Sequence, residues 1–147
     1  MVNSYFGIAE NDYLYLQETR GSKFYNNVAV QCQQICEKLL KGMIELLIPD
    51  AKDELRTHNL KRLYDKVKGY ITLEREHELY LGSFSDFYFD ARYPGDDYTI
   101  VSEEDITLCL QITDAMYSKV SEWRKSYKED KPSTESLIDM ALKISGN

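Results

Sequence analysis

FYNNVAVQCQQICEKLLKGMIELL, residues 24–47, is the stretch that decides the fold. Its apolar residues recur every three or four positions, which is the spacing of one face of an α-helix. That face consists of Phe24, Val28, Cys32, Ile35, Cys36, Leu39, Met43, Leu46 and Leu47. Ser22 is placed to be the N-cap, and Pro49 ends the run because the residue before a proline avoids helical geometry. The sequence therefore predicts a long amphipathic helix that needs partners to cover its apolar face.

Similar helical spacing occurs on both sides of this stretch. The runs cover residues 3–19, 58–70, 72–91 and 102–123, and a shorter run covers 135–144. The expected buried residues of two runs are Leu60, Leu63, Tyr64, Val67 and Tyr70, and Ile106, Cys109, Leu110, Ile112, Met116, Val120 and Trp123. Because short loops join the runs, we predict an all-α, up-and-down bundle of four or five helices over residues 1–124. Residues 125–147 are predicted to be a charged linker and a short C-terminal helix.

The chain carries a formal net charge of −7. General coating of nucleic acid needs Lys and Arg to neutralise phosphates, so any nucleotide site must be local. The three cysteines form no CxxC pair and fall on apolar faces, where a thiol acts as a small hydrophobe. We therefore expect no metal, no cofactor and no nucleophilic cysteine. The odd cysteine count, the lack of a secretory leader and the lack of a membrane-length apolar run predict a cytoplasmic protein.

Two histidines and a basic segment are further candidates. His58 opens the run 58–70, where it either contacts a phosphate or base or, as helix starts favour, acts as a capping or packing residue. His77 lies in the charged turn EREHE without a second histidine or cysteine four residues away, so we expect a solvated or interface histidine rather than a metal ligand. The basic residues near His58 are expected to form a solvated face, namely Arg56, Lys61, Arg62, Lys66 and Lys68.

The segment ARYPGDDY, residues 91–98, combines a helix end, a cation and aromatics around a tight turn. Arg92 there either binds a phosphate with two parallel hydrogen bonds or pairs with Asp96 or Asp97. Just before it, Tyr88 and Phe89 are adjacent, and neighbouring residues of a helix cannot both face one bundle interior. Some aromatic surface is therefore predicted to need another partner.

This segment resembles the ARYP-type signature of HEPN domains, the nucleotide-binding domains of higher eukaryotes and prokaryotes. Residues 24–41 and 58–63 also resemble the second helix and the histidine-started third helix of that family, and the likeness covers about residues 4–123. The resemblance implies an up-and-down helical bundle that commonly forms homodimers. Such domains are often encoded beside a minimal nucleotidyltransferase as a toxin and antitoxin pair, and many are metal-independent RNases.

The resemblance also assigns site residues. Those RNases use an arginine followed four to six residues later by a histidine, whereas the positions after Arg92 hold Asp97, Tyr98 and Thr99, and neither His58 nor His77 follows an arginine at that spacing. Arg92 matches the family arginine. Tyr98 matches a tyrosine that accepts nucleotide groups from the partner transferase in some members, with Asp97 in place of the residue between. The candidate catalytic residues are Arg92, Asp97 and Tyr98, and the candidate nucleotide- or phosphate-binding residues are Arg92, Tyr93, Tyr98 and His58.

Three functions follow from these residues. The leading hypothesis is a homodimeric module that binds a nucleotide or an RNA phosphate through Arg92, with a nucleotidyltransferase as a possible protein partner. The second is a metal-independent endoribonuclease in which Asp97, Tyr98 or a histidine from elsewhere in the fold replaces the usual base. The third is a non-enzymatic interaction protein that uses the aromatic fourth helix as an interface, which Phe87→Asp would break. The sequence leaves open whether the protein is an enzyme.

Overall fold

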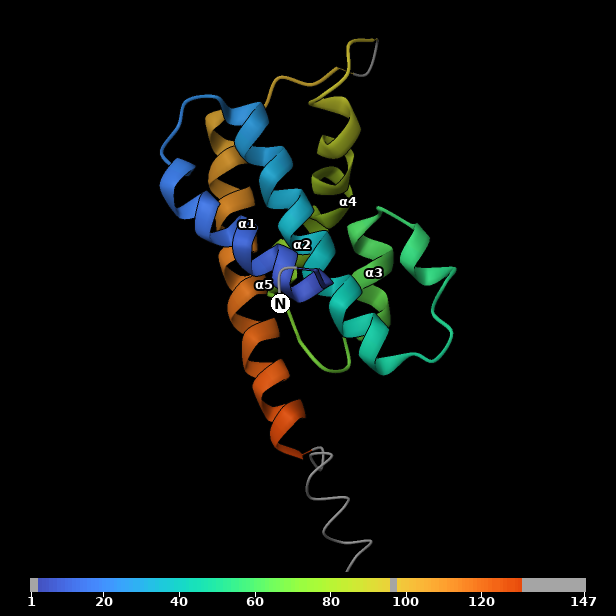
Figure 1. Cartoon of the computed structure of the whole chain (residues 1–147). Coiled ribbons are helices and arrows are strands. Elements are labelled where there is room, and N and C mark those ends of the chain that lie inside the picture. The colour runs from blue at the N-terminus through green and yellow to red at the C-terminus, as the bar shows by residue number, and fades with distance from the viewer. Residues whose placement is uncertain (1–2, 96–97, 131–147) are drawn as a thin grey trace, which may run out of the picture.

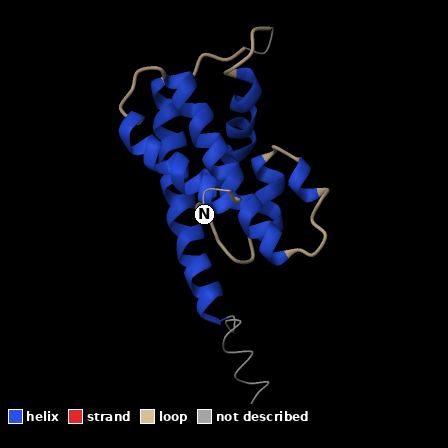
Figure 2. Cartoon of the chain, viewed as in Figure 1, coloured by secondary structure: helices blue, strands red, loops and turns tan. Residues whose placement is uncertain are grey.

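The computed structural model describes residues 3–95 and 98–130, and all regular structure in these residues is helical (Figure 2). The elements are α1 (Tyr5–Thr19), α2 (Tyr25–Leu47), the 3-10 helix η1 (Glu54–Arg56), α3 (Leu60–Val67), α4 (Arg75–Asp90) and α5 (Glu103–Asp130). The predicted all-α bundle is confirmed. The helix predicted over residues 135–144 lies outside the described residues.

α2 is the central helix and packs against each of the other α-helices (Figure 1). Its middle is fully buried, with no exposed surface on Ile35, Leu40 or Met43. Burying each such side chain contributes about 1.5–3 kcal/mol relative to leaving it exposed. Gly42 lets α1 approach closely, because a Cβ at this position would lie 2.7 Å from the Phe6 ring. The buried side chains in the middle of α2 are therefore held by contacts from several helices.

The ends of the apolar face of α2 differ from the prediction. The helix begins at Tyr25, its N-cap position is Phe24, and the Ser22 hydroxyl accepts a hydrogen bond from the Phe24 N–H at 3.1 Å instead of capping the helix. Phe24 is 78% exposed and Leu46 is 42% exposed. Helical spacing shows which residues share a face but not where the neighbouring helices end, so the prediction of burial was wrong for these two residues.

α5 packs along α2 through Ile106, Cys109, Ile112, Met116 and Val120, as predicted. Leu110 and Trp123 are only partly buried. α5 continues to Asp130, past the end predicted near Trp123, and its last turns extend below the rest of the bundle (Figure 1). Residues 125–130, predicted to be a linker, are helical because the first backbone breaker after Trp123 is Pro132.

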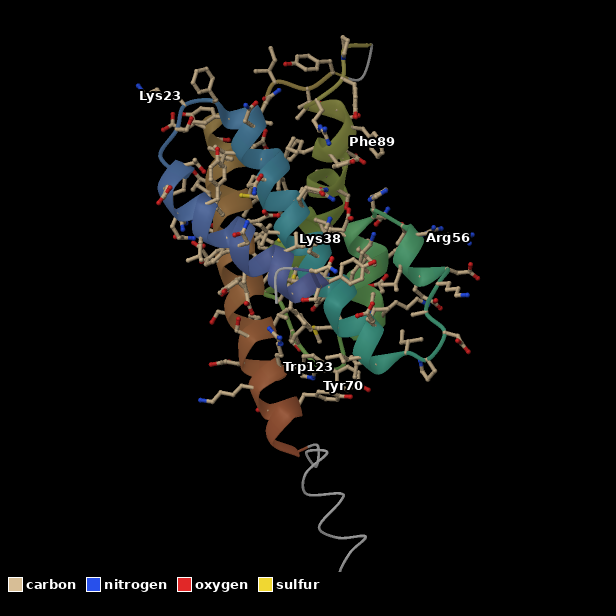
Figure 3. The ribbon with its side chains drawn as sticks, viewed as in Figure 1. Lys23, Lys38, Arg56, Tyr70, Phe89 and Trp123 are labelled. Atoms are coloured by element: carbon tan, nitrogen blue, oxygen red, sulfur yellow. The ribbon has the colours of Figure 1, made fainter. Side chains whose placement is uncertain are left out.

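Two aromatic contacts lie at this lower end of the bundle. Tyr70, predicted to be buried, is 57% exposed and meets the ring of Trp123 edge-on, with the ring centres 6.3 Å apart (Figure 3). It lies beyond the end of α3 at Val67, so the periodicity of that helix no longer sets its direction. Trp123 in turn stacks on Tyr127 at 5.0 Å. These contacts explain why both residues are only partly covered.

α4 begins at Arg75, three positions after the predicted start, and divides its aromatics between the core and the surface. Phe84 and Phe87 are buried, so the interface role predicted for Phe87 is wrong. Phe89 is 52% exposed on the outer side of α4 (Figure 3), which confirms that the helix leaves aromatic surface uncovered.

His77, also on α4, is 8% exposed, and the expectation of a solvated histidine was wrong. It shares a helix face with Leu81 and Phe84, and that face turns inward.

Candidate functional site

A closed loop follows α4 and carries Arg92 and Tyr98. The Arg92 and Tyr93 N–H groups both donate to the Phe89 carbonyl at 3.1 Å, which ends the helix. Gly95 has a φ of 151°, a region that favours glycine because it has no Cβ. At the far side, the Thr99 N–H donates to the Asp90 carbonyl at 2.6 Å. The loop therefore returns to the helix end from which it leaves.

Asn26, in the first turn of α2, ties this loop to the bundle. Its amide nitrogen donates to the Thr99 carbonyl at 2.8 Å and to the Tyr98 hydroxyl at 3.2 Å, and its amide oxygen accepts from the Val101 N–H at 2.7 Å. A weaker bond of 3.4 Å reaches the Ala91 carbonyl. One side chain thus satisfies backbone groups on both sides of the loop and places Tyr98 over the start of α2.

An open cleft of about 630 Å³ lies between α2 and this loop. Its lining consists mainly of polar side chains, namely Asn26, Asn27, Gln31, Gln34, Arg92 and Tyr98, together with Val30 and Ala91. Among the described residues of this lining, Arg92 is the only charged one. The cleft therefore combines one cation with several uncharged groups that donate or accept hydrogen bonds.

Arg92 is exposed, and its guanidinium is supported by aromatic rings. Its Cζ lies 5.0 Å from the centre of the Tyr88 ring and 5.4 Å from the centre of the Tyr93 ring, within the range of cation–π attraction. Within residues 3–95 and 98–130, no carboxylate forms an ion pair with Arg92. The alternative pairing with Asp96 or Asp97 involves residues outside the described part of the chain. Arg92 thus presents its donors to the cleft edge.

A buried polar network lies further along α2 and was missed by the sequence analysis. Glu37 is 1% exposed and accepts hydrogen bonds from Gln33 at 3.1 Å and from His58 Nδ1, which lies 3.0 Å from one carboxylate oxygen and 3.1 Å from the other. Lys41 Nζ is 3.2 Å from the same carboxylate. Gln34 donates to Gln33 at 2.6 Å, which links the network to the cleft.

The electrostatics of Glu37 follow from these contacts. Burial raises the pKa of this carboxyl, but the hydrogen bond from Gln33, the charge of Lys41 and the contact with His58 together outweigh burial, so the pKa is lowered from its ordinary value. Glu37 is therefore ionised at neutral pH. An ionised carboxylate only accepts hydrogen bonds, so His58 donates from Nδ1.

His58 and Arg92 each contact the ring of Tyr88. The His58 ring stacks on Tyr88 with the ring centres 5.2 Å apart and an angle of 13° between the planes, and it meets Phe89 edge-on at 6.2 Å. Its side chain remains 46% exposed. Asn59, rather than His58, caps α3, since its side chain accepts from the Arg62 N–H. The predicted capping role of His58 is therefore wrong, whereas the predicted packing role agrees with its stack on Tyr88, a ring that Arg92 also contacts.

The predicted site residues fall into three groups. Arg92 and Tyr98 line the cleft, Tyr93 contacts Arg92, and His58 stacks on Tyr88, which Arg92 also contacts. Asp97 lies outside the described residues. Asn26, Gln34 and Glu37 were missed. A signal for Glu37 was present in the spacing of Gln33, Glu37 and Lys41, which places three polar residues on one helix face.

The other polar and thiol groups suit a phosphate less well. A second cavity, of about 420 Å³, is lined by Arg62 and Lys66 but also by Asp53, Glu54 and Asp65, which repel anions.

The cysteines are free and buried, and burial raises the pKa of the Cys32 thiol to about 11. The described residues contain no group of His, Cys, Asp and Glu side chains suited to hold a metal ion. None of the helices in the described ranges is both long enough and apolar enough to cross a membrane.

Comparison with known protein families places the chain. The model of the HEPN domain matches residues 2–123, which include α1 to α4, the Arg92 loop and most of α5. The chain belongs to the HEPN domain family. Neither the curated proteins nor the solved structures gave a significant match. Membership of the HEPN family indicates a function that concerns nucleotides or RNA, and HEPN domains often form dimers.

Proposed function

We propose that this HEPN domain binds a nucleotide or an RNA phosphate in the cleft beside Arg92. The observation that carries the proposal is an exposed guanidinium that no described carboxylate neutralises. It is supported by Tyr88 and Tyr93 and lies at the edge of a polar cleft whose other described lining residues are uncharged. Arginine binds phosphate with two parallel, charge-assisted hydrogen bonds. The rings restrict the guanidinium before the ligand arrives, which reduces the entropy lost on binding.

The surroundings of the cleft favour an anion in two further ways. Lys38 donates to the amide oxygen of Gln34 at 3.2 Å, and Gln34 lines the cleft, so Lys38 is a second cation near the cleft. The amide nitrogen of Gln34 donates to Gln33. α2 starts at the cleft without a side-chain cap, so its first N–H groups keep the partial positive charge of a helix N-terminus. Because the whole chain carries −7, this attraction is local.

The test is binding of a 5′-fluorescein 12-nucleotide RNA with 2′-O-methyl riboses, and of ATP as competitor, to wild type and to Arg92→Ala. We expect Arg92→Ala to weaken binding by about 10- to 100-fold, since a charge-assisted hydrogen bond contributes about 1.5–3 kcal/mol. Arg56→Ala is the matched control, because Arg56 is 80% exposed and lies outside the cleft lining. Equal affinities of wild type and Arg92→Ala would rule the proposal out.

We also propose that the domain is a cytoplasmic homodimer that uses the exposed aromatics beside the site. Phe89 and Tyr93 are each 52% exposed, and their ring centres are 6.3 Å apart, so together they offer one apolar patch. Phe89→Asp should convert a dimer to a monomer in size-exclusion chromatography with light scattering. Phe87→Asp would not test the dimer, because Phe87 is buried and a charged side chain at this position would unfold the bundle. A wild-type monomer at 50–100 μM would contradict the dimer.

The proposed protein partner is a nucleotidyltransferase, in a system of the toxin and antitoxin type. Tyr98 supports it as the acceptor, because this residue is 49% exposed and Asn26 donates a hydrogen bond to its hydroxyl beside the cleft. Co-expression with a transferase encoded beside this chain should add a nucleotide mass to wild type and not to Tyr98→Phe. If the chain instead forms complexes through Phe89 but never binds nucleotide, the third hypothesis, a pure interaction protein, would be the better account.

A further inference from the structure

We propose that the cavity between the end of α1 and the start of α2 is a base-stacking subsite, which takes an unpaired nucleobase of the molecule whose phosphate binds Arg92. This inference rests on the proposed function and extends it from a phosphate to a phosphate and a base. It is carried by a cavity that exposes two aromatic rings, those of Tyr15 and Phe24. The same cavity shares two polar side chains, Asn27 and Gln31, with the Arg92 cleft.

The lining of this cavity has the chemistry of a base site rather than that of a phosphate site. The cavity has a volume of about 330 Å³, and ligand pockets of proteins start at about 300 Å³. Its described lining residues are all uncharged, namely Tyr15, Thr19, Ser22, Phe24, Asn27, Val28 and Gln31. Aromatic rings stack on the faces of bases, and hydroxyl and amide groups bind their edges. A lining without a cation therefore suits a base better than a second phosphate.

Phe24 is presented to solvent by a fixed backbone. Its N–H donates to the Ser22 hydroxyl at 3.1 Å, and its carbonyl accepts from the Val28 N–H at 3.2 Å. The residue is 78% exposed. It occupies the N-cap position of α2, where serine, threonine, aspartate and asparagine are favoured because their side chains cap the helix, and Phe24 makes no such hydrogen bond. The ring therefore contributes little to the helix or to the core, and stacking on a base gives it a role.

The cavity and the Arg92 cleft meet at the first two turns of α2. Asn27 and Gln31, one helical turn apart, line both of them. The α1–α2 loop and the loop after α4 lie at the same end of the bundle (Figure 1). In the part of the chain that the structure describes, neither of these two amides has a hydrogen-bond partner, in contrast to Asn26 and Gln34. Asn27 and Gln31 are therefore available to the edge of a base, or to the sugar between that base and its phosphate.

The test measures fluorescence anisotropy with two 5′-fluorescein 12-nucleotide probes, the 2′-O-methyl RNA and a strand with the same backbone from which every base is absent. Phe24→Ala should weaken binding of the RNA by about 5- to 100-fold, the factor that stacking on one aromatic ring contributes, and should change the affinity for the abasic strand by less than about twofold. Tyr15→Ala should act in the same direction. Tyr70→Ala is the matched control, because Tyr70 and Tyr15 are both 57% exposed and Tyr70 lies at the opposite end of the bundle (Figure 3).

Two further exchanges at the same position separate stacking from general apolar contact. Phe24→Trp keeps a flat ring and should bind the RNA at least as tightly as wild type, whereas Phe24→Leu is apolar but not aromatic and should lose most of what Phe24→Ala loses. Unlabelled RNA should quench the added indole of Phe24→Trp. The emission of wild type should stay unchanged, because Trp123 lies at the other end of the bundle (Figure 3). Circular dichroism checks that each variant is folded.

The outcomes separate this subsite from the site on which it rests. Wild-type affinity of Phe24→Ala for the RNA, together with weakened binding by Arg92→Ala, overturns the base subsite and leaves the proposed function standing. Equal losses of affinity for the RNA and the abasic strand in Phe24→Ala also overturn the base subsite, because the ring would then act on the backbone of the strand or on the fold. Equal affinities of wild type and Arg92→Ala for the RNA overturn the proposed function, and the inference with it.

Discussion

The exchange Glu37→Gln tests the buried network most directly. It keeps the size of the side chain but removes the charge that Lys41 Nζ contacts at 3.2 Å, where the two side chains are only 7% and 1% exposed. Breaking a buried ion pair by removing one partner costs about 3–5 kcal/mol, because the other charge stays buried without compensation. Lys38 lies 3.8 Å from the same carboxylate but is 21% exposed, so solvent screens this second contact. We therefore expect a loss of about 3 kcal/mol.

The double variant Glu37→Gln with Lys41→Met provides the control. Methionine removes the unpaired ammonium but keeps the length of the side chain. The double variant should therefore lose clearly less stability than the sum of the losses in Glu37→Gln alone and Lys41→Met alone. The difference, a coupling free energy of about 2 kcal/mol, is measured by urea unfolding at pH 7 followed by circular dichroism. A loss below about 1 kcal/mol for Glu37→Gln, or strict additivity in the cycle, would refute the claim that the fold depends on this ion pair.

Three further predictions concern stability and thiol chemistry. Gly42→Ala should destabilise by about 1–2 kcal/mol in urea unfolding because its methyl meets the Phe6 ring at 2.7 Å, whereas Gly82→Ala, a helical position with nothing within 4 Å, should stabilise by about 0.5–1 kcal/mol. Native Cys32, with its pKa raised to about 11, should react with iodoacetamide at pH 8 at least about 100-fold more slowly than in urea, and fast labelling would contradict its burial. The pKa of Glu37 is lowered from its ordinary value of 4.5, so ionised Glu37 stabilises the fold above pH 4.5, and this stabilisation is lost as the pH falls below that value. In Glu37→Gln, the free energy of unfolding should therefore decrease less steeply between neutral and acidic pH.

The sequence predicted the elements whose causes are local. The periodicity of residues 24–47 and the breaker Pro49 locate α2, and the turn residues after Ala91 locate the loop that carries Arg92. Ser22 was assigned as a cap from its residue type alone. Whether a serine caps a helix or the turn before it depends on backbone angles, and these are not encoded in residue type.

The pairing of His58 with Glu37 could not be predicted from the sequence in the same way. The two residues are separated by a loop and η1, and only the packing of α3 on α2 brings them together. A glutamate followed four residues later by a lysine is the usual pattern of a solvent-exposed helix face, so this spacing does not indicate that Glu37 and Lys41 are buried. His77 shows the opposite case, because charged neighbours suggested exposure while its own helix face turns into the core.

The buried polar network of Glu37, Lys41 and His58 lies at the centre of the bundle, on α2, where apolar side chains are expected. α2 contacts every other α-helix, and an apolar side chain at residue 37 would fill the space without a desolvation cost. Violations of core patterning in natural proteins concentrate at functional sites, where stability is given up for a fixed polar geometry. If the Glu37–His58 pair serves only packing, replacing Glu37 and Lys41 together by Leu and Met should raise stability without changing RNA binding. If the network also fixes the geometry of the Arg92 site, the same variant should gain stability and weaken RNA binding, because Gln34 and Tyr88 connect the network to the cleft and to Arg92.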